Sequence, residues 1–239
     1  MDNNIVQING KEVFICEHHH HVLYHWNKYK NQKPFLLTFD HHTDTRPAFQ
    51  NYLYYTRNHE NFENEQNFLL EKIKLNDINT ILKLKNDEHI DASIRSDFFK
   101  KALILSEESN SCKPNRIYTI NGNEDYKHEP IIVNSRSFDD FNLVIETNNL
   151  KEHLKKFELC IPQSDWIDNF ILDIDLDFVK TVKSVKPKDA SFFQYLAKKA
   201  ITITIAKEET WIDQWKRQYD ENISVEFLLQ ALLNIIFAS

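Results

Sequence analysis

The feature that most constrains this chain is its near-absence of glycine. Only Gly10 and Gly122 occur among 239 residues, where average usage would supply about seventeen. Folds that bind a phosphate through the backbone need two or three closely spaced glycines, because only glycine lets main-chain amides approach the phosphate that closely. The sequence therefore excludes a dinucleotide-binding fingerprint and a P-loop, and its chemistry must come from side chains.

Composition and charge narrow the class of protein further. Hydrophobic residues make up 41% of the chain, and the formal net charge is −7. That apolar content can fill a sizeable core, and an acidic balance without a basic stripe argues against nucleic-acid binding. The three cysteines form no CxxC pair, which excludes a cysteine zinc site and fits a reducing compartment. With no signal peptide and no bilayer-length apolar stretch, we expect a cytoplasmic protein that binds no membrane, with its oligomeric state undetermined.

Short β-type segments alternate with segments of helical period, as in an α/β domain. Asn9-Gly10 lies between two β-type runs and predicts an N-terminal β-hairpin. The apolar runs 35–39 and 170–172 predict buried strands. We therefore predict one domain over residues 1–239, a three-layer αβα sandwich around a mostly parallel sheet. Further helices are expected at 20–29, 66–74, 78–85, 92–102, 150–157, 191–200 and 225–236, and strands at 116–120, 131–133, 142–146 and 201–205.

Acidic and histidine side chains directly follow the first apolar run. Residues 40–44 read Asp-His-His-Thr-Asp. In an extended backbone, alternate side chains face the same way, so Asp40, His42 and Asp44 can converge on one point. Two carboxylates and an imidazole suit a divalent metal such as manganese, zinc or iron. For this string alone, a solvated loop with a helix cap is the alternative.

Three acids at a period of two end the second apolar run. Asp173, Asp175 and Asp177 would face one way while the residues between them face the core. Ionised acids aligned at a buried strand end repel one another unless a cation or a basic partner is present. An edge strand with a solvated acidic face is the alternative for this string alone. Because open α/β sheets place their sites at strand ends, the two strings together favour a hydrolase with two metal ions.

With these motifs the sequence resembles the arginase/deacetylase (ureohydrolase) superfamily. The resemblance rests on Cys16-Glu17-His18-His19, on residues 40–44, and on Asp-Ile-Asp-Leu-Asp-Phe at 173–178. It is greatest to a divergent branch in which some members resemble peptide arginases, which convert arginine side chains of ribosomally made peptides to ornithine. The resemblance implies an arginase-like fold and two Mn2+ ions, with other divalent metals as alternatives.

The same resemblance implies six metal ligands. Asp40 and Asp173 would bridge the two ions. The remaining ligands would be His19 and Asp44 on one ion, and His42 and Asp175 on the other.

Two of these assignments have alternatives in the sequence. His19 is chosen from the run His18–His21 because the histidine of the motif follows an acidic or histidine neighbour. Asp177 is either a metal ligand, if the motif is matched two residues later in the sequence, or a residue that contacts the ligands without binding the metal. His41 would point to the opposite face of the strand and stabilise the structure.

The resemblance also implies catalytic and substrate-binding residues. His89 would shuttle a proton near the departing amine, together with Asp44, and Asn86 in the same segment would contact the substrate. Glu208, with Glu209 in reserve, would pair with the guanidinium because a glutamate follows a late strand in such enzymes. The alternatives are a surface histidine at a helix start for His89 and a solvated charge cluster around Glu208.

Together these residues imply a manganese-dependent hydrolase that releases urea from a guanidino group. The segment around His19 lacks the glycines of the larger arginases, and the chain is short, so we expect an arginine-containing peptide rather than free arginine as the substrate. The alternatives are a single-metal amide hydrolase or deacetylase, and a non-catalytic binding protein that keeps a metal for stability.

Overall fold

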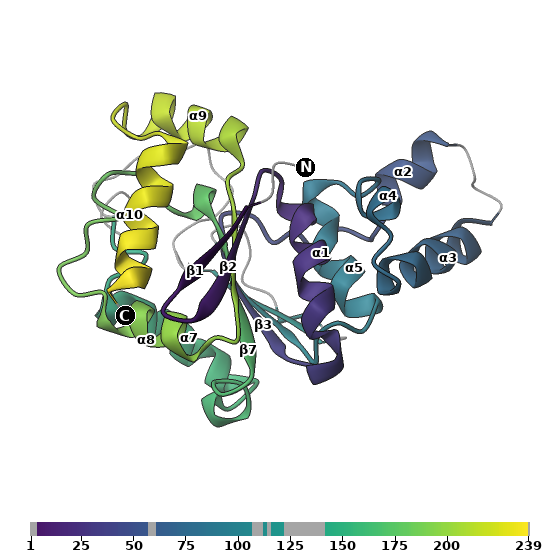
Figure 1. Cartoon of the computed structure of the whole chain (residues 1–239), viewed down its shortest axis with the longest axis horizontal. Coiled ribbons are helices and arrows are strands. Elements are labelled where there is room, and N and C mark those ends of the chain that lie inside the picture. The colour runs from purple at the N-terminus through teal and green to yellow at the C-terminus, as the bar shows by residue number, and fades with distance from the viewer. Residues whose placement is uncertain (1–3, 57–60, 107–111, 114–115, 122–141, 239) are drawn as a thin grey trace.

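A mixed eight-stranded sheet forms the centre of the molecule, in the order β1-β2-β8-β7-β3-β4-β6-β5 (Figure 1). The computed structural model describes residues 4–56, 61–106, 112–113, 116–121 and 142–238. Six strands run parallel, and the two edge strands β1 and β5 are antiparallel to their neighbours. The strands are β1 (Asn4–Ile8), β2 (Lys11–Cys16), β3 (Phe35–Asp40), β4 (Ala102–Ser106), β5 (Cys112–Lys113), β6 (Ile117–Asn121), β7 (Phe170–Asp175) and β8 (Ile203–Ala206).

The N-terminal hairpin is confirmed. Ile8 pairs with Lys11, so only Asn9 and Gly10 form the turn between β1 and β2. Both residues have positive φ, 50° at Asn9 and 77° at Gly10. This is the backbone that a two-residue hairpin turn requires, and asparagine followed by glycine adopts it at the lowest cost. The predicted mostly parallel α/β sheet is also confirmed.

Helices lie on both sides of this sheet (Figure 1). Alternate residues of the strands point into two separate apolar cores, as Leu36 and Leu37 do on β3. Among the described residues, none of the helices is both long and apolar enough to cross a membrane. On one side lie α1 (Val22–Trp26), α2 (Gln50–Tyr55), α3 (Phe62–Lys74), α4 (Ile78–Ile81) and α5 (His89–Arg95), and on the other α7 (Thr147–Lys155), α8 (Ser191–Lys199), α9 (Glu209–Gln218) and α10 (Val225–Phe237).

Several predicted elements differ from the observed ones. The helix predicted at 92–102 ends at Arg95, because Asp97 adopts a left-handed φ of 63° that turns the chain. Ala102 then begins β4, whose five residues are all buried between β3 and β6, so this continuous apolar run is a central strand.

The strand predicted at 142–146 did not appear. Residues 142–145 form turns instead, and the amide of Glu146 donates to the carbonyl of Leu143 at 2.9 Å. The strand predicted at 131–133 lies outside the described residues. The helix predicted at 78–85 stops at Ile81, and α9 was not predicted.

Candidate metal centre

The acids of both strings lie at the carboxyl ends of two neighbouring parallel strands, β3 and β7. Leu172 and Ile174 on β7 point into one core, so Asp173 and Asp175 face the opposite side of the sheet, toward α1 and α5. Asp40 ends β3 on that same side. The alternation expected from the sequence therefore brings the carboxylates of two distant segments to one edge of the sheet.

His19 occupies the middle of this cluster of acids. It begins a short 3-10 helix (His19–His21) directly after β2, and its side chain is fully buried. Its Nδ1 lies 3.1 Å from Asp175, 3.2 Å from Asp44 and 3.4 Å from Asp40, measured to a carboxylate oxygen of each. The structure thus places His19 against the acids, while His18, His20 and His21 line an adjacent cleft.

A second group of ligand atoms adjoins the first through Asp40. His42 Nδ1 lies 3.1 Å from Asp177 Oδ2 and 3.9 Å from Asp40 Oδ1, and the His42 amide donates to Asp40 Oδ1 at 2.7 Å. Within the described residues, three sets have ligand atoms lying within 4.8 Å of one another and could hold a metal ion. These sets are His19 with Asp40 and Asp175, Asp40 with His42 and Asp177, and His19 with Asp44 and His89.

Asp173 was expected to bridge the ions, but the structure places it behind His19. Its Oδ2 lies 2.8 Å from His19 Nε2 and accepts a hydrogen bond from Thr38 at 2.8 Å. Its Oδ1 accepts one from Thr204 at 2.5 Å. Asp173 belongs to none of the three sets in the described part of the chain, whereas Asp177 belongs to one. A carboxylate on the far nitrogen of a histidine orients the ring for metal ligation.

Four buried atoms around this cluster have no hydrogen-bond partner within the described residues: His19 Nδ1, Asp40 Oδ2, Asp177 Oδ2 and His89 Nε2. Buried polar atoms are nearly always hydrogen-bonded, because each unsatisfied one costs about 1–3 kcal/mol. Carboxylate oxygens and imidazole nitrogens are also ligands of divalent cations. The unsatisfied atoms therefore fit a metal centre built from the side chains present.

The pKa values of these acids are shifted because their carboxylates are buried close together. Burial, followed by the neighbouring carboxylates, raises the pKa of Asp40 and of Asp175 well above the usual range. Burial likewise raises the pKa of Asp44 to about 6. For Asp177 burial also acts upward, but the nearby imidazole of His42, whose Nδ1 lies 3.1 Å away, outweighs it and leaves the pKa lowered. Without a cation, the cluster therefore holds protons that free carboxylates would release.

The two buried histidines respond in opposite directions. Burial acts to lower the pKa of His19, but the charge and hydrogen bond of Asp173 raise it well above 6.5. Burial and the charge of His19 together lower the pKa of His89 far below that value. His89 is thus a neutral imidazole with one unsatisfied nitrogen.

The contribution of Asp44 to the stability of metal-free protein should fall as the pH rises from 4 to 6. The pKa of Asp44 is about 6 in the folded state against an ordinary 3.8, so at this residue the unfolded chain binds fewer protons in this interval. This change corresponds to about 3 kcal/mol from Asp44 alone, whereas buried histidines with a lowered pKa, such as His20 and His89, act in the opposite direction. Thermal unfolding of Asp44→Asn and of the parent with EDTA isolates Asp44, and the stability of the variant relative to the parent should rise across this range.

Bound Mn2+ should reverse this trend, because the cation replaces the protons and binds better as the carboxylates ionise. The melting temperature measured with Mn2+ should therefore rise with pH. A metal-free stability of Asp44→Asn that stays level or falls relative to the parent between pH 4 and 6 would contradict the raised pKa of Asp44.

The cluster opens into a cleft of about 980 Å³. Asp44, Asp175 and Glu208 contribute acidic groups to its lining, and His42 and Trp211 contribute aromatic rings. The ring of Trp211 lies 4.6 Å from that of His42, between centroids. A molecule from solvent can therefore reach both groups of ligand atoms from one side.

Glu208 and Asn86 lie in this cleft, as expected, and they hold each other. Glu208 accepts from the His19 amide at 2.7 Å and from the Asn86 side chain at 2.8 Å. Asn86 in turn accepts from His20 Nδ1 at 2.7 Å, and burial lowers the pKa of His20 to about 3, which leaves it neutral. Glu208 also has a left-handed φ of 42°. Glu209 is exposed at the start of α9.

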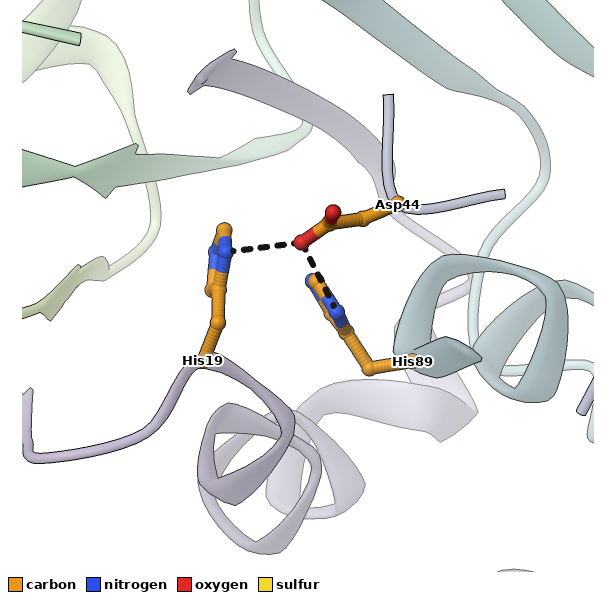
Figure 2. Close-up of side chains that lie close together, drawn as sticks. All are labelled: His19, Asp44 and His89. Atoms are coloured by element: carbon orange, nitrogen blue, oxygen red, sulfur yellow. Dashed lines mark ion pairs between the residues drawn. The ribbon is translucent and has the colours of Figure 1, made fainter. Parts of the chain in front are cut away.

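His89 is fully buried, so the alternative of a surface histidine at a helix start is wrong. Its ring lies 4.1 Å from that of His19, between centroids, and its Nδ1 lies 3.5 Å from Asp44 (Figure 2). The same Nδ1 donates to the carbonyl of Asn86 at 2.7 Å. The neutral tautomer therefore leaves the lone pair on Nε2.

Sequence reasoning missed the two threonines that hydrogen-bond to Asp173. Thr38 and Thr204 are the direct cross-strand partners of Asp173 on β3 and β8. Thr38 precedes Asp40 by two residues and therefore shares its face. That spacing was a visible signal for Thr38, whereas Thr204 could be found only once the pairing of β7 with β8 was known.

No model of a known protein family matches this chain, and no curated protein matches it. The chemistry open to the site follows from its residues. Carboxylates and imidazoles at the floor of a cleft can hold divalent cations where a molecule from solvent can reach them.

Proposed function

We propose that this protein is a metal-dependent hydrolase with two ions, which releases urea from a peptidyl arginine and leaves ornithine. The observation that carries the proposal is the position of Asp40, which belongs to two adjoining sets of ligand atoms beside an open cleft. Two cations that share a carboxylate activate a water molecule for attack and stabilise the tetrahedral species that follows. The mostly parallel sheet, with helices on both sides, supports the arginase-like sandwich that the resemblance implies.

In this proposal the ligands of the later strand are Asp175 and Asp177. Both oxygens of Asp173 already accept hydrogen bonds from threonines, which supports a positioning role for it behind His19. The first ion would be held by His19, Asp40, Asp44 and Asp175, and the second by Asp40, His42, Asp175 and Asp177.

Manganese is the proposed metal because carboxylates outnumber imidazoles among these ligands. Carboxylate oxygens suit manganese and magnesium, whereas thiolate-rich or imidazole-rich sites select zinc and copper. The two histidines distinguish the set from the all-oxygen sites that magnesium and calcium prefer. The ligand chemistry thus supports two Mn2+ ions.

Glu208 would bind the guanidinium of the substrate. A carboxylate and a guanidinium form charge-assisted hydrogen bonds, which are about twice as strong as neutral ones. Asn86 and the His19 amide hold both oxygens of Glu208 in place, yet each oxygen keeps a second lone pair for the substrate. Asp44 and Asp175 on the same lining add to the attraction for a cation.

Asp44 and His89 would move the proton that the leaving nitrogen needs. Asp44 lines the cleft, and its carboxylate lies 3.5 Å from the buried ring of His89. The Nδ1 that faces Asp44 carries the proton of the neutral His89 ring and donates to the Asn86 carbonyl, so His89 can accept a proton only at Nε2. Asp44 is therefore the group that would hand the proton to the leaving nitrogen, and Nε2 of His89 is where the pair could take one up.

The size of the cleft supports a peptide substrate. Its volume of about 980 Å³ lies at the upper end of the roughly 300–1,000 Å³ of pockets that enclose drug-sized ligands. A single free arginine would leave much of this volume to water. A peptide would fill it, with one arginine reaching the ligand atoms.

Metal-loaded protein should release urea from an arginine-containing peptide and leave ornithine in equal amount. We expect free arginine to react more slowly because it leaves most of the cleft unfilled. Colorimetric urea detection and mass spectrometry of the peptide measure the two products, with the same peptide carrying lysine for arginine as the control. The protein should be purified without a His-tag or a nickel column, because the histidines at 18–21 can bind nickel themselves.

Other results would identify the alternatives. Turnover of an acetyl-lysine peptide without urea would indicate a deacetylase, and one ion per chain would indicate a single-metal hydrolase. Stabilisation by metal with no turnover of either peptide would indicate a non-catalytic protein.

A further inference from the structure

A fully buried lysine lies beside the second group of ligand atoms, and the proposed function gives it no role. Lys180 is 0% exposed. Its Nζ donates to His41 Nδ1 at 2.9 Å and lies 4.6 Å from the ring centroid of Trp215 and 5.5 Å from that of Tyr219. Burying an ammonium group is unfavourable unless other contacts compensate for the lost hydration. The faces of two aromatic rings and the lone pair of an imidazole offset part of that cost.

His41, the acceptor for Lys180, is held at three points. Its ring nitrogen accepts from Lys180, its amide donates to Asp177 Oδ1 at 3.2 Å, and its carbonyl accepts from Ser106 at 2.9 Å. Its ring also meets that of Trp215 edge-on, at 4.9 Å between centroids. Movement of His41 would therefore displace Asp177 directly.

The same residue sets the position of His42. His42 follows His41 in the chain, and their rings meet edge-on at 4.6 Å. Trp215 closes the arrangement from α9, because its Nε1 donates to the carbonyl of Asp177 at 3.1 Å. Lys180, His41 and Trp215 thus brace the two residues whose side chains, His42 Nδ1 and Asp177 Oδ2, lie 3.1 Å apart.

We propose that Lys180 is a positioning residue for the second ion, acting through His41 on His42 and Asp177. The inference rests on the two-ion centre proposed above. The first ion takes His19 from the segment after β2 and Asp44 from the loop after β3, whereas Lys180 donates to His41, which lies beside the second. Loss of the brace should therefore weaken one ion and spare the other.

The Lys180→Met variant tests this role, because it keeps an unbranched side chain only one atom shorter and removes the charge and the donors. Titration of Mn2+ into metal-free protein should show two ions in the parent. We expect about 10- to 100-fold weaker binding of the second ion in the variant, the range found when groups behind metal ligands are removed, with the first ion unchanged. Electron paramagnetic resonance separates coupled from isolated Mn2+ and reports the loss independently of turnover.

Two comparisons separate positioning from general damage. Lys188→Met, at an exposed lysine of the same loop, should bind both ions as the parent does. Lys180→Arg keeps a cation and donors, so it should lose less affinity than Lys180→Met. In a double-mutant cycle, Lys180→Met should add little to His41→Ala, because both act on the same brace.

The results of this titration also distinguish a failure of this inference from a failure of the proposed function. Two ions bound with unchanged affinity in Lys180→Met would overturn the role of Lys180 and leave the two-ion hydrolase standing. A parent that binds only one ion would overturn both. If Lys180→Met does not fold, His41→Ala alone should show the selective loss, and equal weakening of both ions there would overturn the inference.

Discussion

Replacing Asp40 with asparagine should lower urea release by at least about 1,000-fold, because Mn2+ catalysis of this kind supplies several kcal/mol to the transition state. Asp40 is the residue common to the two adjoining sets of ligand atoms, so both ions lose a charged ligand at once. The fold should survive, since the oxygen of the asparagine can still accept from the His42 amide. The loss would thus belong to the centre rather than to unfolding.

Elemental analysis and urea assay on the same preparation measure this prediction. We expect fewer than two ions per chain together with the loss of turnover. Asp97→Asn is the control, because Asp97 is exposed, lies outside the lining of the cleft and pairs with Arg116 at 3.1 Å. Urea release that persists at the parent rate after Asp40→Asn would exclude the proposed centre.

Asp177→Asn and Asp173→Asn should have different effects on metal content. Removing the charge of Asp177 should empty the second site and lower urea release by about 1,000-fold or more, because Asp177 supplies a buried ligand atom to the set that it forms with Asp40 and His42. Asp173→Asn should keep two ions with about 10- to 100-fold weaker binding, because it alters only the orientation of His19.

Manganese titrations of both variants measure this difference. Asp168→Asn is a suitable control, since Asp168 is exposed just before β7 and pairs with Lys199. The reverse result, with Asp173→Asn losing an ion and Asp177→Asn keeping both, would restore the earlier register in which Asp173 and Asp175 are the ligands.

Much of the sheet could be predicted from the sequence because its signals are local. Asn9-Gly10 requires only a two-residue turn, and the apolar runs before Asp40 and Asp173 are short enough to be strands rather than helices. The run at Ala102–Ser106 was not predicted as a strand: the predicted helix extended to Ala102, and four apolar residues before Ser106 carry no period that separates a helix from a strand. Only its position between β3 and β6 in the sheet identifies this run as a strand.

The side-chain period of two also predicted that the acids share one face of the strand, but not which residues each of them contacts. Asp173, Asp175 and Asp177 are evenly spaced, and each lies between two apolar residues in the sequence. In the fold, Asp173 lies in register with Thr38 and Thr204, while Asp175 ends the strand and accepts from the amide of Asp177 at 3.0 Å. That bend carries Asp177 to His42.

The sequence by itself determined the kind of chemistry open to this protein. With two glycines it cannot build a backbone phosphate cradle, and it places acids and histidines where buried strands end. Only the tertiary structure decided which of them meet. It brought His19 rather than its neighbours to the acids and put Asp173 behind it, because those contacts depend on the register between strands that lie far apart in the chain.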